Sequence, residues 1–196
     1  MNICVYGAAS SLVDSSYINV GEKICELLAR RGHNLVFGAG NFGMMGAAAR
    51  GFHRGGGTVT GVVPEFFKNQ DIEPLYEKCD TLIYTTDMRE RKQIMEDNAD
   101  AFIIAPGGVG TFDEFFQVLA LKQLARHNKP IVLLNISGYY DPFKVMFENA
   151  KAQNFLREGF MNLFRICGEN DMEQMVEYLE AEPEDADPLR AYVKVN

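Results

Sequence analysis

Apolar positions along this chain follow two alternating patterns. Short runs rich in β-branched and other apolar residues are separated by longer segments whose apolar residues recur at helical spacing. The short runs predict strands at 3–6, 35–37, 58–63, 81–85, 102–105, 131–134 and 163–167. The longer segments predict helices near 16–31, 43–54, 87–99, 111–126, 141–153 and 170–180.

This alternation predicts the fold class. Buried β-rich runs separated by helices are typical of βαβ units, in which helices cover both faces of a parallel sheet. We expect a single-domain, Rossmann-like, doubly wound α/β protein with a mainly parallel sheet of about seven strands. The 196 residues suffice for one such domain. The domain is expected at 1–180, with residues 181–196 as an acidic, partly disordered tail.

Composition excludes several functional classes. A net charge of −8 argues against a nucleic-acid groove. Neither the four cysteines nor the three histidines show the spacing of a zinc site, and no disulfide framework is indicated. The chain begins without a signal-peptide pattern and contains no run long enough to span a membrane. We therefore expect a cytoplasmic protein that needs no metal or cofactor and binds neither nucleic acid nor membrane.

The most informative segment is 106–114, which reads Pro-Gly-Gly-Val-Gly-Thr-Phe-Asp-Glu and joins a predicted strand to the predicted helix 111–126. Its three glycines allow a bound group to approach the backbone closely. The start of the helix offers N–H groups and partial positive charge, a combination that binds phosphate. The segment ends on Glu114, a poor neighbour for phosphate unless the carboxylate has a chemical task. This conflict points to catalysis.

A structural interpretation of the same residues stays open. Thr111 and Glu114 have the spacing of a capping box, in which Thr111 is the N-cap and Glu114 bonds back from the third helical position. That arrangement stabilises a helix and requires no catalysis.

A second glycine-rich loop, 38–46, follows the strand at 35–37 and matches G-x-G-x-x-G at Gly38, Gly40 and Gly43. The motif is shared by dinucleotide-binding loops and by ordinary strand–helix turns. The acidic residue expected after the next strand to bind a ribose has only Glu65 as a candidate, after a proline turn. The motif therefore leaves a full dinucleotide open without supporting it.

Arg91 is the third candidate residue. In the helix 87–99 it falls in the middle of the stripe formed by Met88, Ile94, Met95 and Ala99, whereas Arg89, Gln93 and Glu96 group on a face expected to be solvated. An arginine on a core-facing stripe requires a compensating partner. We expect Arg91 to face a carboxylate or a substrate phosphate, with Lys92 at the edge of the stripe within reach of the same site.

The helix 111–126 has apolar residues around nearly its whole circumference. Such a helix must be covered on more than the side that faces the sheet. The sequence therefore predicts a homodimer, with this helix at or near the interface.

These segments together resemble the Lonely Guy family of cytokinin-activating phosphoribohydrolases, often described as "possible lysine decarboxylase". The family pattern PGGxGTxxE is matched at Pro106, Gly107, Gly108, Gly110, Thr111 and Glu114. Its glycine-rich element is matched from Gly38 to Gly46, its Met-x-x-Arg-Lys element by Met88, Arg91 and Lys92, and its opening strand by Gly7, Ser10 and Ser11. The chain departs from the family at Arg89, where a histidine is usual, and at Ala120 and Leu121, where Thr-Trp is usual.

The resemblance implies hydrolysis of the N-glycosidic bond of a nucleoside 5′-monophosphate, by an enzyme that is a homodimer or a larger homo-oligomer. It implies Glu114 and Arg91 as catalytic residues. The residues expected to bind substrate are Gly7, Ser10, Gly40, Gly43, Met88, Lys92, Gly107, Gly108, Val109, Gly110, Thr111 and Asp113. The alternative is a non-catalytic nucleotide or cofactor carrier on the same fold.

Overall fold

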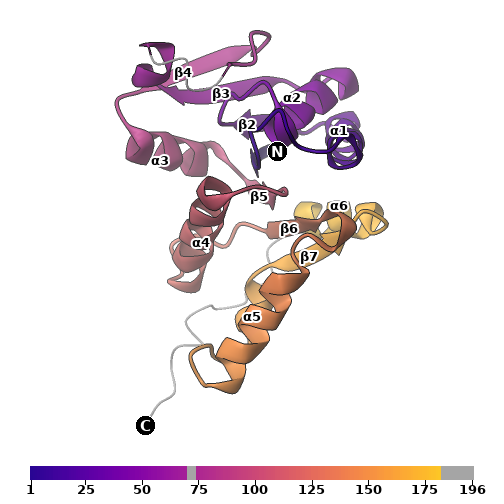
Figure 1. Ribbon diagram of the computed structural model, residues 1–196, viewed down its shortest axis with the longest axis vertical. Coiled ribbons are helices and arrows are strands. Elements are labelled where there is room, and N and C mark those ends of the chain that lie inside the picture. Colours follow the sequence, from indigo (N-terminus) through magenta and orange to yellow (C-terminus); the bar gives the residue numbers. More distant parts are fainter. Residues whose placement is uncertain (70–73, 182–196) are drawn as a thin grey trace.

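The computed structural model describes residues 1–69 and 74–181 and contains a seven-stranded sheet (Figure 1). The strand order is β4-β3-β2-β1-β5-β6-β7, and every neighbouring pair is parallel. The strands are β1 (Asn2–Tyr6), β2 (Asn34–Phe37), β3 (Val59–Pro64), β4 (Thr81–Thr85), β5 (Ala101–Ile104), β6 (Ile131–Asn135) and β7 (Arg165–Gly168). The predicted α/β, doubly wound fold is confirmed.

The described residues also form three short 3₁₀ turns, η1 (Glu65–Asn69), η2 (Ile136–Gly138) and η3 (Phe160–Leu163), and six helices, of which five lie between strands and the sixth follows β7. The helices are α1 (Ser15–Arg30), α2 (Gly43–Gly55), α3 (Met88–Asn98), α4 (Val109–Gln123), α5 (Asp141–Ala152) and α6 (Met172–Glu180). Each lies close to its predicted position. The predicted tail, 181–196, lies outside the described residues except for Ala181.

Hydrophobic cores lie on both faces of the sheet. One contains Ile24 of α1, Ala48 of α2 and Met175 of α6 against alternate strand residues such as Val5. The other contains Met95 of α3, Phe115 of α4 and Phe147 of α5. Because β1 is buried on both faces, its residues are apolar or aromatic throughout Ile3–Tyr6, as expected for an inner parallel strand.

The strand order places a topological switch point between β1 and β5. From β1 the chain first builds outward through β2, β3 and β4, and then returns to add β5, β6 and β7 on the other side. In sheets of this type, ligands bind outside the carboxyl ends of the strands at such a point. The loops after β1 and β5 therefore lie where a fold of this type binds its ligand. No helix among 1–69 and 74–181 is long and apolar enough to cross a membrane.

Candidate active site

The loops at the switch point are tied together. The Ala8 amide, in the loop after β1, donates to the Pro106 carbonyl after β5 at 3.0 Å, and the Met45 amide donates to the Ala8 carbonyl at 3.1 Å. The loops after β1 and β5 thus form one surface with the start of α2. The two glycine-rich segments predicted from the sequence, 38–46 and 106–114, both contribute to this surface.

Two tyrosines from the loop after β6 hold the segment before α4. The Tyr139 hydroxyl donates to the Gly107 carbonyl at 2.6 Å, and the Tyr140 hydroxyl donates to the Ala105 carbonyl at 2.8 Å. Gly107 has no space for a side chain, because an added Cβ would lie 2.1 Å from Thr111 Oγ1. The path of the backbone into α4 is therefore fixed by packing and by hydrogen bonds.

Gly108 and Gly110 differ from Gly107. An ideal Cβ at either position meets no protein atom within 4 Å, and both residues are exposed. Gly108 also has φ −94° and ψ −154°, a conformation open to any residue. The fold itself does not require glycine here, and open backbone at a helix start suits a bound anion.

The predicted capping box is wrong. The N-cap of α4 is Gly108, so Thr111 lies inside the first turn and Glu114 lies in the second. Thr111 is buried against Gly107, and Glu114 is half-buried. The glycine-rich segment itself forms the start of the helix, which is why the helix begins earlier than predicted. Glu114 consequently has no task in capping α4.

Arg91 is buried, as its position on the stripe predicted, with 6% of its surface exposed. Its Nε donates to the Val62 carbonyl and one terminal nitrogen donates to the Gly38 carbonyl, both at 3.0 Å. These partners are backbone oxygens, Val62 within β3 and Gly38 directly after β2, and the expectation that Arg91 also faces a carboxylate or a substrate phosphate stays a prediction. A Cβ on Gly38 would lie 1.8 Å from the guanidinium, so the glycine makes room for the arginine.

Other residues of the Met-x-x-Arg-Lys element lie at the mouth of the site. Lys92 Nζ and Asp113 Oδ2 form an ion pair at 2.9 Å that joins α3 to α4. Met88 is 39% exposed, although its place in the stripe predicted burial, because it lies in the first turn of α3. Arg89 is exposed as predicted.

Glu96 corrects the prediction of a solvated face. It is half-buried, since α4 packs beside α3, and the Gln117 side-chain amide donates to it. Burial raises the pKa of Glu96. The helical periodicity of α3 does not by itself show that the face with Glu96 packs against α4.

The loop before α2 is packed tightly against the loop after β1. Gly43 has φ +57°, and a Cβ there would lie 2.3 Å from the Ala8 carbonyl oxygen. A Cβ on Gly7 would lie 2.8 Å from Met44 Cβ. Gly40 forms an antiparallel bridge with Leu75. These glycines therefore have packing roles, whereas Ser10 is exposed and accepts from the Leu12 amide at 3.2 Å.

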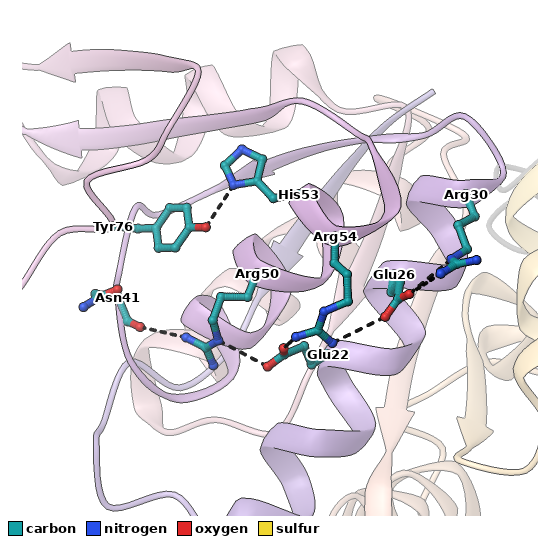
Figure 2. Close-up of polar contacts among 8 residues, drawn as sticks. All are labelled: Glu22, Glu26, Arg30, Asn41, Arg50, His53, Arg54 and Tyr76. Atoms are coloured by element: carbon teal, nitrogen blue, oxygen red, sulfur yellow. Dashed lines mark hydrogen bonds and ion pairs between the residues drawn. The ribbon is translucent and has the colours of Figure 1, made fainter.

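Charged side chains of α1 and α2 form a network that contacts the loop 38–46 at Asn41 (Figure 2). Arg50 bonds Glu22 on α1 at 3.2 Å and donates to the Asn41 carbonyl at 3.4 Å. His53 contacts the Tyr76 hydroxyl at 2.9 Å, and the Tyr76 amide donates to the Ala39 carbonyl at 2.8 Å. The loop is thus held on both sides by residues that the sequence motif does not contain.

Sequence reasoning missed three aromatic residues at this site: Tyr6, Tyr139 and Tyr140. Tyr139 and Tyr140 follow a strand end, which was the available signal, but their target loop lies about 32 residues away in sequence. Tyr6 read as an ordinary strand residue. Among the described residues, no group of three or more histidine, cysteine or acidic side chains has the arrangement of a metal site.

Comparison with known proteins adds a family match. A family model described as "Possible lysine decarboxylase" matches residues 45–179. The chain is 34% identical over 179 residues to a cytokinin riboside 5′-monophosphate phosphoribohydrolase of Arabidopsis thaliana, covering 91% of this chain and 77% of the relative. It is 37% identical over 158 residues to one of Oryza sativa subsp. japonica (80% and 64%) and 36% identical over 166 residues to one of Rhodococcoides fascians (85% and 83%).

Similar solved structures include two proteins of a different description. The molybdenum cofactor carrier protein of Chlamydomonas reinhardtii superposes with a TM-score of 0.68 at 21% identity, covering 92% of this chain and 98% of that one. The molybdenum cofactor binding protein of Rippkaea orientalis gives 0.64 at 19% identity, covering 92% and 96%. At these identities the likeness shows the fold alone.

Proposed function

The chain belongs to the possible lysine decarboxylase family, with the Lonely Guy phosphoribohydrolases among its relatives, and on this premise we propose that it hydrolyses the N-glycosidic bond of a purine or cytokinin nucleoside 5′-monophosphate. The products are the free base and ribose 5-phosphate. One observation carries the proposal: Glu114 is half-buried in the second turn of a helix whose glycine-rich start is open to a ligand.

The chemistry follows from this arrangement. Cleavage at the anomeric carbon passes through an oxocarbenium-like transition state, which an adjacent carboxylate stabilises. Glu114 also orients a water molecule and takes its proton as the new C–O bond forms and the C–N bond breaks, and the protonated carboxyl group then gives that proton to the departing base. Arg91, held by the Val62 and Gly38 carbonyls, supplies positive charge that stabilises the negative charge developing on the departing base. We assign both residues catalytic roles.

The 5′-phosphate is bound by the start of α4 in this proposal. The open backbone at Gly108, Val109 and Gly110 lies in the first turn, where helix N–H groups have no partner within the helix. Lys92 adds positive charge nearby, although Asp113 shares it. Binding energy from the phosphate then fixes the ribose against Glu114 and lowers the barrier.

Gly108→Ala should leave the melting temperature unchanged and raise the KM for AMP by about tenfold, because the added methyl group meets the phosphate and no protein atom.

AMP should also have a much higher kcat/KM than adenosine, since adenosine lacks the group that the helix binds. Kinetics with both substrates on both proteins checks this. Equal kcat/KM for AMP and adenosine, or a Gly108→Ala variant with unchanged KM, would remove the loop from phosphate binding.

A non-catalytic carrier is the alternative on this fold, and the solved structures named above include carriers. A carrier has a use for glycine loops, but it has none for a carboxylate beside the bound ligand. The sequence relatives of higher identity carry enzyme names. A carrier would return its nucleotide intact, so product analysis separates the two functions.

We also propose that the protein is a homodimer through α4 and α5. Phe116 of α4 is 40% exposed and stacks on Phe143 of α5, and Val145 and Met146 of α5 are 66% and 43% exposed. We assign these exposed apolar side chains of α4 and α5 to a two-fold interface, in which each copy covers the other. Because α4 also carries Glu114, the contact would brace the catalytic helix.

Light scattering during size exclusion should give twice the chain mass of 22.0 kDa. Val145→Glu should shift the mass toward the monomer, because it places a charge in the apolar contact. Leu12→Glu, at a 91% exposed position in the loop after β1, is the matched control and should leave the mass unchanged. A fully active wild-type monomer at micromolar concentration would refute the interface.

A further inference from the structure

The hydroxyl of Tyr6 is unusual in this molecule. Tyr6 is the last residue of β1 and is 1% exposed. Within 1–69 and 74–181, its Oη is the one fully buried side-chain oxygen or nitrogen without a hydrogen bond to another oxygen or nitrogen, and it interacts with the Cys4 thiol of the same strand. Buried polar atoms in folded proteins are nearly always paired, so each exception requires an explanation.

Packing does not explain the hydroxyl. The Tyr6 ring stacks on Phe102 of β5, with centroids 6.2 Å apart and planes 6° from parallel. It belongs to the same core as Met95 and Phe115. A phenylalanine would keep these contacts and would bury no unpaired oxygen. The Cys4 thiol is a weak acceptor, so the hydroxyl costs stability in this state until it gains a stronger partner in the working site.

Tyr6 directly precedes the loop after β1 that forms part of the candidate site. It precedes Gly7, and its carbonyl accepts from the Ala105 amide, at the start of the glycine-rich loop, at 2.8 Å. Its side chain faces the layer of α3 and α4, because it shares a core with Met95 and Phe115. Glu114 is the chain neighbour of Phe115 on α4. Tyr6 is thus on the face of the sheet that is covered by α4, the helix that carries Glu114.

The electrostatics of this region agree with the placement. Burial first, then the neighbouring Cys4 thiol and the Glu114 carboxylate, raise the pKa of Tyr6, so its hydroxyl keeps its proton at neutral pH and is a donor. The other charged groups that act on the β1 side chains are Glu96 and Arg91, both from α3.

We propose that Tyr6 is a positioning residue whose hydroxyl donates a hydrogen bond to the Glu114 carboxylate when substrate is bound. The bond holds the carboxylate in one orientation toward the attacking water and favours its ionised form. This role rests on the proposed hydrolysis and adds to it a residue that the family motifs do not contain.

Tyr6→Phe tests the role by removing one oxygen. With AMP as substrate, kcat should fall by about tenfold while KM stays within about twofold, as expected for loss of a hydrogen bond to a charged group. The acidic limb of the pH–activity profile should move to higher pH, because the ionised carboxylate loses a donor. The melting temperature should stay the same or rise. Tyr178→Phe, on the distant helix α6, is the matched control and should change neither kcat nor the profile.

The outcomes separate this inference from the function on which it rests. Wild-type protein that releases no base would refute the proposed function and the role of Tyr6 with it. An active wild type with an unchanged kcat and pH profile in Tyr6→Phe would overturn the positioning role alone. So would a lower melting temperature with an unchanged profile, because the hydroxyl would then be structural.

Discussion

Replacing Glu114 by glutamine should leave a folded protein that binds AMP and releases base at least about 100-fold more slowly, because general acid–base groups contribute roughly 10²–10⁴-fold. The amide keeps the size of the side chain but neither accepts a proton from water nor stabilises positive charge at the anomeric carbon. Helix stability should be unaffected, since Glu114 lies in the second turn of α4 and Gly108 is the N-cap. A loss of activity in this variant would therefore report on the chemistry of Glu114 and not on folding.

The measurement is the initial rate of base release at saturating AMP, with AMP affinity determined by calorimetry on the same preparations. Glu148→Gln, an exposed carboxylate on α5, is the control and should retain the wild-type rate. A Glu114→Gln variant with more than about a tenth of wild-type turnover would exclude Glu114 as the general base.

Arg91→Ala should lose activity to a comparable extent and should also destabilise the fold. The change leaves the buried Val62 and Gly38 carbonyls without their donor, and it removes the positive charge from the α3 side of the site. We expect the free energy of unfolding to fall by about 2–3 kcal/mol, the usual cost of unpaired buried polar groups.

Arg91→Lys distinguishes the two effects. Lysine keeps the charge, but a single ammonium does not reproduce the fork that reaches two strand ends. Activity should therefore fall in this variant as well, with a smaller loss of stability. Arg89→Ala, two residues earlier and exposed, is the control and should behave as wild type in urea unfolding and in base release. Equal effects of Arg89→Ala and Arg91→Ala on turnover would contradict the assignment of Arg91.

The fold was predictable because each element carries its own periodic signal. The apolar runs at β1 and β5 are buried on both faces, and their sequences contain little else. Arg91 was predictable for the converse reason, since a charge within an apolar stripe requires a partner. The strand order was not predictable, because local periodicity does not say which strands pair.

The site contacts that the sequence did not predict are formed between loops that are far apart in the chain. The partners of Arg91 are backbone carbonyls at Gly38 and Val62, and no side-chain pattern marks a carbonyl as a partner. The support from Tyr139 comes from a loop two elements away. The start of α4 was placed too late because glycines, poor helix formers in a sequence, here begin the helix.

The central claim is that this protein breaks the N-glycosidic bond of a nucleoside 5′-monophosphate. Its most direct test is to incubate a catalytic amount of the protein with AMP or with N6-isopentenyl-AMP and to quantify the products by chromatography. We expect free base and ribose 5-phosphate in equal amounts, in large molar excess over protein, from at least one of the two nucleotides. Nucleotide that binds and is recovered intact from both incubations would contradict it and identify a carrier.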